Sequence, residues 1–328
     1  MEPNRRIFSG IQPSGVVHLG NYIGAIRNWA SLLDEYECIF CIVDYHAITI
    51  PYDPKELQQR IFDAALANIA AGLDPNRCLL FVQSAIPEHT ELTWIFNCVT
   101  PLGELQRMTQ FKDKSRRQHT ASVNVGLLNY PVLQAADILL YKAGWVPVGE
   151  DQIQHVEFTR EVARKFNGAF GETFPEAQVL LAPQSRIMGL DGQGKMSKSM
   201  DNYIGLLESD ETIRGKLRTA VTDPARIRRN DPGNPDICNI YQFHKAFSPA
   251  ETVAMVDREC RVAGIGCVDC KQQLADNLIE HLTPIRDYAG ELQAHPDVVH
   301  DALATSARKC KAIATEVMEE VRVKVGIR

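Results

Sequence analysis

Two segments far apart in the chain carry residues suited to holding phosphate groups. The first is a tract rich in glycine, proline and serine, residues 9–21, which runs into a helical pattern, and the second is Lys195-Met196-Ser197-Lys198-Ser199. Glycines let backbone N–H groups approach an anion, and the start of a helix adds partial positive charge. Two lysines beside hydroxyl groups suit a loop that closes over phosphates and neutralises charge as pyrophosphate leaves. Each segment alone is compatible with an ordinary loop, but the pair, roughly 175 residues apart, predicts a nucleotide site.

Four cysteines in the C-terminal half form a second candidate site. Their spacing is C-x21-C-x6-C-x2-C, with two glycines beside the closest pair. Four thiolates can bind zinc or an iron–sulfur cluster, and the alternative is four unligated cysteines. Cys38 and Cys41 are also two residues apart, but they lie in an apolar strand-like run and therefore predict core packing. The four candidates are Cys238, Cys260, Cys267 and Cys270.

The composition predicts a cytoplasmic globular protein. The 328 residues, 45% of them hydrophobic, suggest about two domains with sizeable cores. No apolar run is long enough to span a bilayer, and nine cysteines, an odd number, fit a secreted disulfide framework poorly. The net charge of -6 excludes a uniformly basic nucleic-acid binder, so nucleic acid would have to meet local basic patches, for which a solvated surface is the alternative. The two candidate patches are Lys112, Lys114, Arg116 and Arg117, and Arg226, Arg228 and Arg229.

The N-terminal half alternates strand and helix patterns, and this alternation positions the glycine-rich tract. It predicts a parallel sheet with helices on both faces and a ligand site at the carboxyl ends of the strands. The first predicted strand ends at the glycine-rich tract and the second at Asp44-Tyr45-His46, so the two can share a crevice. The predicted strands are residues 6–9, 38–44, 79–83, 146–148 and 178–182, and the predicted helices are 20–35, 54–71, 89–98, 127–142 and 152–166.

The C-terminal part of the chain has only helical patterns. The sequence therefore predicts an α/β domain, residues 1–200, followed by an all-helical domain, residues 201–296, with a last helix, 297–328, that can pack back on the first domain. The predicted helices are residues 210–220, 240–247, 249–264, 270–294 and 297–325.

The two phosphate-binding segments resemble the signatures of the class I aminoacyl-tRNA synthetases. His18-Leu19-Gly20-Asn21 is similar to the first signature, with Asn21 where many members have a second histidine, and residues 195–199 match the second. Three further strings narrow the resemblance to the tryptophanyl-tRNA synthetases of bacteria, and it extends from Ile7 to the final helix. They are VDYHAIT at 43–49, YPVLQAADILLY at 130–141 and PVGEDQ at 147–152.

The resemblance implies a fold, an activity and partners. The fold is a Rossmann-like catalytic domain followed by a helical domain that binds the tRNA anticodon. The activity is activation of L-tryptophan with ATP and Mg²⁺ and its transfer to tRNA(Trp), in a homodimer. No protein nucleophile is needed, because the tryptophan carboxylate attacks the α-phosphorus of ATP itself.

The resemblance also assigns the ATP-binding residues. Lys195 and Lys198 would be catalytic, and the Gly149-Glu150-Asp151 turn would meet the ribose, with a plain helix N-cap at Asp151 as the structural alternative. The implied ATP-binding set is Gln12, Pro13, Ser14, His18, Gly20, Asn21, Gly149, Glu150, Asp151, Ile187, Lys195, Met196, Ser197, Lys198 and Ser199.

Asp137, a lone charge in the apolar helical pattern 132–143, is the candidate for recognising the indole ring. An unpaired buried charge is costly, so the alternative is a structural salt bridge or cap. A carboxylate only accepts hydrogen bonds and the indole N–H only donates, so this slot would favour tryptophan over phenylalanine, whereas tyrosine must be excluded by shape. By resemblance, Tyr130 and Gln152 would hold the α-amino group. Gln134, where many relatives have methionine, and His46, with ATP as its other candidate partner, complete the tryptophan set.

The four late cysteines also match the resemblance. A subset of bacterial tryptophanyl-tRNA synthetases carries a four-cysteine 4Fe–4S motif with nearly this spacing. Zinc sites with four cysteines more often show two C-x2-C pairs, and here there is one, so the cluster is favoured and zinc is the alternative. The cluster would be structural, ordering the region that meets the anticodon.

Two other functions fit parts of the sequence. One is a nucleotidyltransferase with the same loops that never binds tRNA, against which the helical C-terminal region argues. The other is a non-catalytic RNA-binding or sensor protein on a synthetase scaffold, against which the intact lysine string argues.

Overall fold

The core of the protein is a parallel sheet of five strands in the order β3-β2-β1-β4-β5. The computed structural model describes residues 4–109, 124–181 and 187–327. Each strand lies where the sequence predicts one, and the predicted α/β class with a helical C-terminal region is confirmed. The strands are β1 Arg6–Ile11, β2 Glu37–Ile42, β3 Leu79–Val82, β4 Trp145–Val148 and β5 Gln178–Leu181.

Alternating side chains of the strands build two hydrophobic clusters, one on each face of the sheet. Ile7 and Cys38 belong to one cluster, whereas Phe8 and Cys41 belong to the other. Cys38 and Cys41 are thus both buried and lie on opposite faces, as a strand requires. Helix α4 (Pro54–Ala70) contributes to the first cluster. The second cluster draws on α5 (Glu88–Val99), α8 (Val125–Leu139) and α9 (Ile153–Phe170).

The first predicted helix, 20–35, differs from the observed one. It consists of α1 (Leu19–Asn21), a π-helical segment (Tyr22–Ile26) and α2 (Arg27–Ser31), and it ends before residue 35. The π segment includes Gly24, whose poor helix propensity weakens the regular hydrogen-bond ladder there. Such wide turns are frequent at functional sites, and this one lies directly after the first signature. Two short helices, α3 (Asp44–Ala47) and α6 (Leu102–Arg107), were not predicted.

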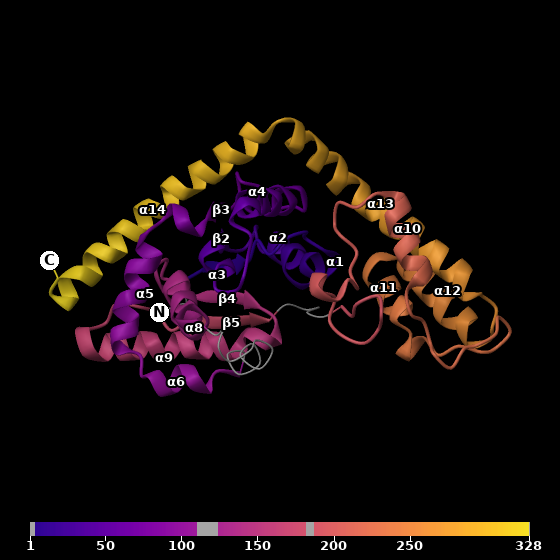
Figure 1. Cartoon of the computed structure of the whole chain (residues 1–328), viewed down its shortest axis with the longest axis horizontal. Coiled ribbons are helices and arrows are strands. Elements are labelled where there is room, and N and C mark those ends of the chain that lie inside the picture. Colours follow the sequence, from indigo (N-terminus) through magenta and orange to yellow (C-terminus); the bar gives the residue numbers. More distant parts are fainter. Residues whose placement is uncertain (1–3, 110–123, 182–186, 328) are drawn as a thin grey trace.

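The C-terminal part of the described chain is helical, and α10 (Asp210–Thr219), α11 (Asn239–Phe247) and α12 (Ala250–Arg261) lie together at one end of the molecule (Figure 1). Helix α13 (Cys267–Ala294) packs on α4, so the first hydrophobic cluster runs continuously from the sheet into this region. None of the helices in the described ranges has the length and apolar character of a membrane span. The C-terminal helices are α10 Asp210–Thr219, α11 Asn239–Phe247, α12 Ala250–Arg261, α13 Cys267–Ala294 and α14 Pro296–Val325.

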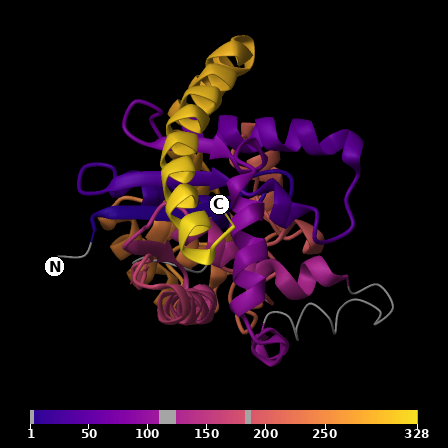
Figure 2. The same cartoon turned by 90° about the vertical axis from the view of Figure 1, so that its left-hand side faces the viewer.

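The last helix, α14, turns back from α13 and crosses the sheet at its β3 edge (Figure 2). Its buried side chains, including Cys310 and Met318, join the second hydrophobic cluster. Ion pairs fasten it to the start of α5: Arg322 donates to both oxygens of Glu91, and Lys311 pairs with Glu88. This helix therefore holds α5 against the sheet.

Candidate functional site

A cavity of about 430 Å³ opens at the carboxyl ends of β1, β2 and β4. Its size is that of a small-molecule site, and its position is the usual one in parallel α/β sheets. It brings together residues from both predicted substrate sets. Those that line it are Gln12, Ser14, Gly20, Asn21, Gly149, Asp151 and Lys195 from the ATP set, and His46, Tyr130, Gln134, Asp137 and Gln152 from the tryptophan set.

The other described members of the ATP set lie around the cavity rather than on its wall. Pro13, Ile187 and Met196 are buried, and Glu150 is exposed to solvent. His18 starts α1, and Ser197 and Lys198 continue the lysine string. The side chain of Ser199 and the whole basic run at 112–117 lie outside the described residues.

The two signature segments are in direct contact. A Cβ built on Gly15 would lie 2.1 Å from Nζ of Lys198, and one on Gly20 would lie 3.3 Å from Cβ of Met196. Backbone hydrogen bonds join the same regions, because Leu19 donates to Ile204 at 2.9 Å. The lysine string therefore lies beside the glycine-rich tract, where both can reach one nucleotide.

The lysine string is held by Asn202, a residue that the sequence did not single out. Its side-chain oxygen accepts from the Ser197 N–H at 2.8 Å, and its Nδ2 donates to Asp191 at 3.0 Å. The backbone of Gly189 donates to Gly194 at 2.7 Å, which closes the glycine-rich lead into a turn. Asn202 is buried, so the string is anchored from its inner side.

His18 and Asn21 form a reciprocal cap at the start of α1. The Asn21 N–H donates to Nδ1 of His18 at 3.3 Å, and the His18 N–H donates to the side-chain oxygen of Asn21 at 3.1 Å. Burial, and then the charge of Lys195, lowers the pKa of His18 to about 4. The ring is therefore neutral at pH 7, and because Nδ1 accepts, its proton is on Nε2.

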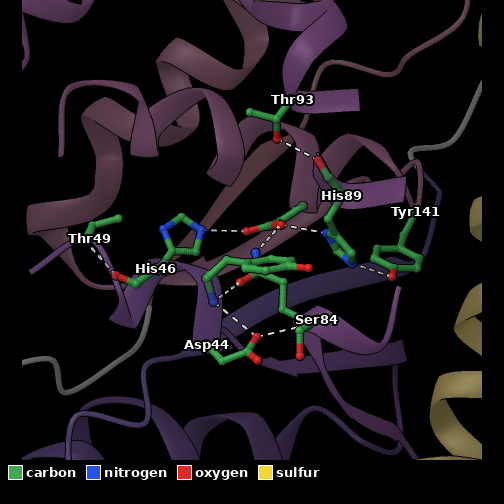
Figure 3. A network of polar contacts seen from close by, with 10 residues as sticks. Asp44, His46, Thr49, Ser84, His89, Thr93 and Tyr141 are labelled. Atoms are coloured by element: carbon green, nitrogen blue, oxygen red, sulfur yellow. Dashed lines mark hydrogen bonds and ion pairs between the residues drawn. The ribbon is translucent and has the colours of Figure 1, made fainter. Parts of the chain in front are cut away.

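The carboxylate of Asp137 is fully buried and accepts three hydrogen bonds. Oδ1 accepts from Nε2 of Gln83 at 2.7 Å and from Nδ1 of His89 at 2.6 Å, and Oδ2 accepts from Nε2 of His46 at 2.8 Å. Figure 3 shows His46 and His89 approaching this central group from opposite sides. The structural alternative, a paired carboxylate, is thus what the structure contains, and both histidines come from elements other than α8.

Asp137 remains ionised despite its burial. Burial alone raises its pKa, but the hydrogen bonds and charges of His46 and His89 outweigh that effect and bring the pKa to about 2. Gln83 and His89 were not found by sequence reasoning. Gln83 directly follows β3, so the rule that sites lie at strand ends could have found it, whereas no local pattern distinguishes His89 on α5.

Asp151 is not the N-cap of α9, so the structural alternative for this residue does not apply. Gly149 precedes a 3-10 turn, Glu150–Gln152, and α9 starts at Ile153 with Gln152 in the cap position and no side-chain cap bond. The Asp151 side chain accepts from Nε2 of Gln152 at 3.3 Å and lines the cavity. Nearby, the hydroxyl of Tyr130 contacts Nε2 of His155 at 2.9 Å, which fixes the Tyr130 ring at the cavity wall.

The four late cysteines lie close enough to influence one another. Burial, and then the other three thiols, raises the pKa of Cys270 to about 12. Nη1 of Arg226 donates to Sγ of Cys260 at 3.7 Å, and Arg226 also donates to the backbone of Ile265 at 2.7 Å, so it braces this region. Within the described ranges, no group of three or more Cys, His, Asp or Glu is arranged to hold a metal ion. The predicted metal centre is therefore not shown.

Comparisons with known proteins agree with the geometry. The family described as "tRNA synthetases class I (W and Y)" matches residues 2–283. A tryptophan–tRNA ligase of Deinococcus radiodurans is 58% identical over 326 residues, 98% of this chain and 98% of that protein, and one of Thermotoga maritima is 41% identical over 97% and 98%. A crystal structure of the tryptophanyl-tRNA synthetase of Campylobacter jejuni, complexed with ADP and tryptophan, aligns with a TM-score of 0.89 at 35% identity, covering 98% of this chain and 99% of that one. The chain belongs to the tryptophanyl-tRNA synthetases, a family of class I aminoacyl-tRNA synthetases.

Proposed function

We propose that this chain is a tryptophan–tRNA ligase, which activates L-tryptophan with ATP and transfers it to tRNA(Trp). The observation that carries the proposal is the shared cavity. Ser14 of the first signature, Lys195 of the second and Asp137 all line it. A nucleotide held by the two signatures would therefore have its phosphates next to a slot with a buried hydrogen-bond acceptor.

Both chemical steps depend on positioning and charge neutralisation. First, the tryptophan carboxylate attacks the α-phosphorus of ATP, and the bond to pyrophosphate breaks. We assign Lys195 and Lys198 to the negative charge that develops on the departing phosphates, with Mg²⁺ entering as part of the ATP substrate. Then the terminal ribose hydroxyl of the tRNA attacks the carbonyl carbon, and AMP leaves.

The neutral His18 ring gives the first signature a defined chemistry. With Nδ1 engaged by the cap, Nε2–H is the free donor and can serve a phosphate oxygen. Asn21 contributes through the cap itself, so the second histidine of other members is not needed to orient His18. The rest of the proposed ATP set is unchanged from the one that the resemblance implies, with the turn at 149–151 facing the ribose.

For tryptophan, we assign Asp137 to the indole N–H and Tyr130 with Gln152 to the α-amino group. Three acceptor positions of the Asp137 carboxylate are filled by protein donors, and a carboxylate offers about four, so one remains for the substrate. Gln134 and His46 form the adjoining wall of the cavity. His46 holds Asp137 directly, which favours its place in the tryptophan set over a contact with ATP.

We further propose a cytoplasmic homodimer in which residues 201–296 bind the tRNA anticodon and residues 1–200, covered by α14, carry the catalysis. Three large apolar side chains are exposed on α5, α6 and α8: Trp94 at 70%, Leu102 at 59% and Val125 at 71%. Exposed aromatic and aliphatic side chains of this kind are typical of subunit interfaces. Trp94→Arg should convert a dimer to a monomer in analytical ultracentrifugation, and an unchanged mass would place the interface elsewhere.

We also propose that Cys238, Cys260, Cys267 and Cys270 hold a 4Fe–4S cluster, with zinc as the alternative. Burial raises the pKa of Cys238 and Cys260, but the backbone N–H groups of Ile240 and Tyr241 face the Cys238 sulfur and the guanidinium of Arg226 lies at Cys260. These groups offset part of the effect of burial and would support thiolates that ligate a cluster. The cluster would have a structural role in the helical region. Anaerobically purified protein should be brown and contain iron and sulfide, and zinc without iron would reverse the assignment.

One aminoacylation assay with tryptophan and tRNA tests the proposed function. Formation of tryptophanyl-tRNA, and tryptophan-dependent exchange of pyrophosphate into ATP, are the expected results. Exchange without charging of tRNA would indicate a nucleotidyltransferase. The absence of both reactions would indicate a non-catalytic RNA-binding or sensor protein.

A further inference from the structure

The three side chains that donate hydrogen bonds to Asp137 approach its carboxylate from two sides. His46 lines the cavity, as Asp137 does, whereas Gln83 and His89 are both fully buried and approach from behind it. The two rear donors fill Oδ1, and His46 occupies one position of Oδ2. The single open acceptor position is therefore on Oδ2, the oxygen that is bound from the cavity side.

Both rear donors are themselves fixed in orientation. The side-chain oxygen of Gln83 accepts from the Tyr45 N–H at 3.1 Å, so its amide must turn Nε2 toward Asp137. Nε2 of His89 contacts the hydroxyl of Tyr141 at 2.9 Å. Burial raises the pKa of Tyr141 well above its usual value, so the hydroxyl keeps its proton and can donate it. Both ring nitrogens of His89 are engaged, and Nδ1 is the one that faces the carboxylate.

We infer that Gln83 and His89, with Tyr141 behind them, are positioning residues that fix the Asp137 carboxylate and thereby set the requirement for an N–H group on the substrate. This inference rests on the proposed contact between Asp137 and the indole. The two rear hydrogen bonds fix the plane of the carboxylate. They also occupy Oδ1, so that the substrate N–H binds to Oδ2. Without them, the carboxylate would turn toward its remaining donor or take up a proton, and a protonated oxygen no longer accepts the indole N–H.

The decisive substrate pair is tryptophan and 3-benzothienylalanine, in which sulfur replaces the indole N–H and the ring shape is kept. The measurement is kcat/KM for each amino acid in pyrophosphate exchange. His89→Leu removes the rear donor, and His89→Asn places an amide N–H near the position of Nδ1. We expect His89→Leu to lower the preference for tryptophan about tenfold or more, chiefly through KM for tryptophan, with KM for ATP changed by less than about twofold. His89→Asn should restore part of the preference.

A pH series separates positioning from general damage. In His89→Leu, KM for tryptophan should rise as the pH falls toward 5, because the carboxylate has lost a donor that favours its ionised form. The wild type should show no such rise. Gln83→Met serves as a second variant if His89→Leu does not fold, and it should shift the preference in the same direction.

The outcomes distinguish two failures. If the wild-type enzyme uses both amino acids equally well, the proposed contact of Asp137 with the indole fails. If the wild type discriminates but both rear variants discriminate as well as it does, with flat pH series, the positioning role alone is overturned.

Discussion

The amine of Lys198 occupies the space in which a side chain on Gly15 would begin. The gap from Nζ to a Cβ at Gly15 would be 2.1 Å, far below van der Waals contact, and Gly15 has φ +127, which side-chain-bearing residues rarely adopt. The absence of a side chain at Gly15 in the first signature thus leaves the space that the Lys198 side chain of the second signature occupies. This contact explains in physical terms why both segments belong to one site.

Gly15→Ala should therefore lower activity by displacing Lys198. We expect kcat for pyrophosphate exchange to fall about 100-fold, in the range seen when one group that stabilises a transition-state charge is lost. Lys198→Ala should cause a loss of similar size, and the double variant should lose little more than either single one.

Gly171→Ala is the matched control for that substitution. Gly171 also has a positive φ, +93, at the end of α9, but nothing lies within 4 Å of the position where its Cβ would be. It should lower the melting temperature through backbone strain while leaving kcat unchanged. If Gly15→Ala retained full exchange activity, the contact with Lys198 would not matter for catalysis.

Asp137→Ala should raise KM for tryptophan strongly and leave KM for ATP nearly unchanged. Truncation removes the proposed acceptor and also leaves the donors of Gln83, His46 and His89 without their shared partner. We expect an increase of about 100-fold, as for a site that loses a hydrogen bond to a buried substrate group. The two constants are read from pyrophosphate exchange with each substrate varied in turn, and an equal loss of both would count against the assignment.

The sheet and the long helices could be predicted because their patterns are local. Each strand is an apolar run between turn residues, and the helix α4 starts with the cap residue Asp53 followed by Pro54. The π-helical segment within the first helix could not be predicted from a local pattern, because such a segment depends on tertiary contacts as well as on Gly24. Helix α9 starts at Ile153 rather than at the predicted residue 152, because a 3-10 turn precedes it, and Asp151 in that turn lines the cavity.

The residues of the candidate site also differ in whether a local pattern reveals them. The residues of the two signatures and of the apolar helix stand in contiguous strings, so the resemblance could assign them. Gln83 and His89 come from β3–α5, and their link to Asp137 exists only after the fold brings three segments together. Asn202 was missed for the same reason, since its role is to bond Ser197 and Asp191 on either side of a turn.

Helix α14 should contribute measurably to the stability of the catalytic part. Met318 is fully buried against the sheet cluster, so Met318→Ala should lower the free energy of unfolding by about 2–4 kcal/mol. Val323→Ala, on the same helix but 68% exposed, is the control and should change it by less than about 0.5 kcal/mol. Urea denaturation followed by circular dichroism measures both. Equal effects of the two variants would show that the helix does not pack as described.

His18 should remain neutral down to about pH 5. Burial and the nearby Lys195 lower its pKa to about 4, whereas a histidine in the unfolded chain titrates near 6.5. Between these two values the unfolded state binds more protons than the folded state. His18 therefore makes the fold less stable as the pH falls from about 6.5 toward 4, and it has no such effect above that window. The imidazole signals in an NMR titration of the ATP-free protein should show the low pKa directly.

His18→Asn separates this titration from the cap. The asparagine oxygen can take the place of Nδ1 as acceptor for the Asn21 N–H, so the start of α1 is preserved, but the group no longer binds a proton. Urea unfolding at pH 7 and pH 5 should show a smaller loss of stability for His18→Asn than for the wild type. The other buried histidines contribute equally to both proteins, so they cancel in this comparison. An equal loss in the two proteins would mean that another group titrates in this pH range. The His18 ring would then be more exposed, and would bind a proton more readily, than its contact with Asn21 implies.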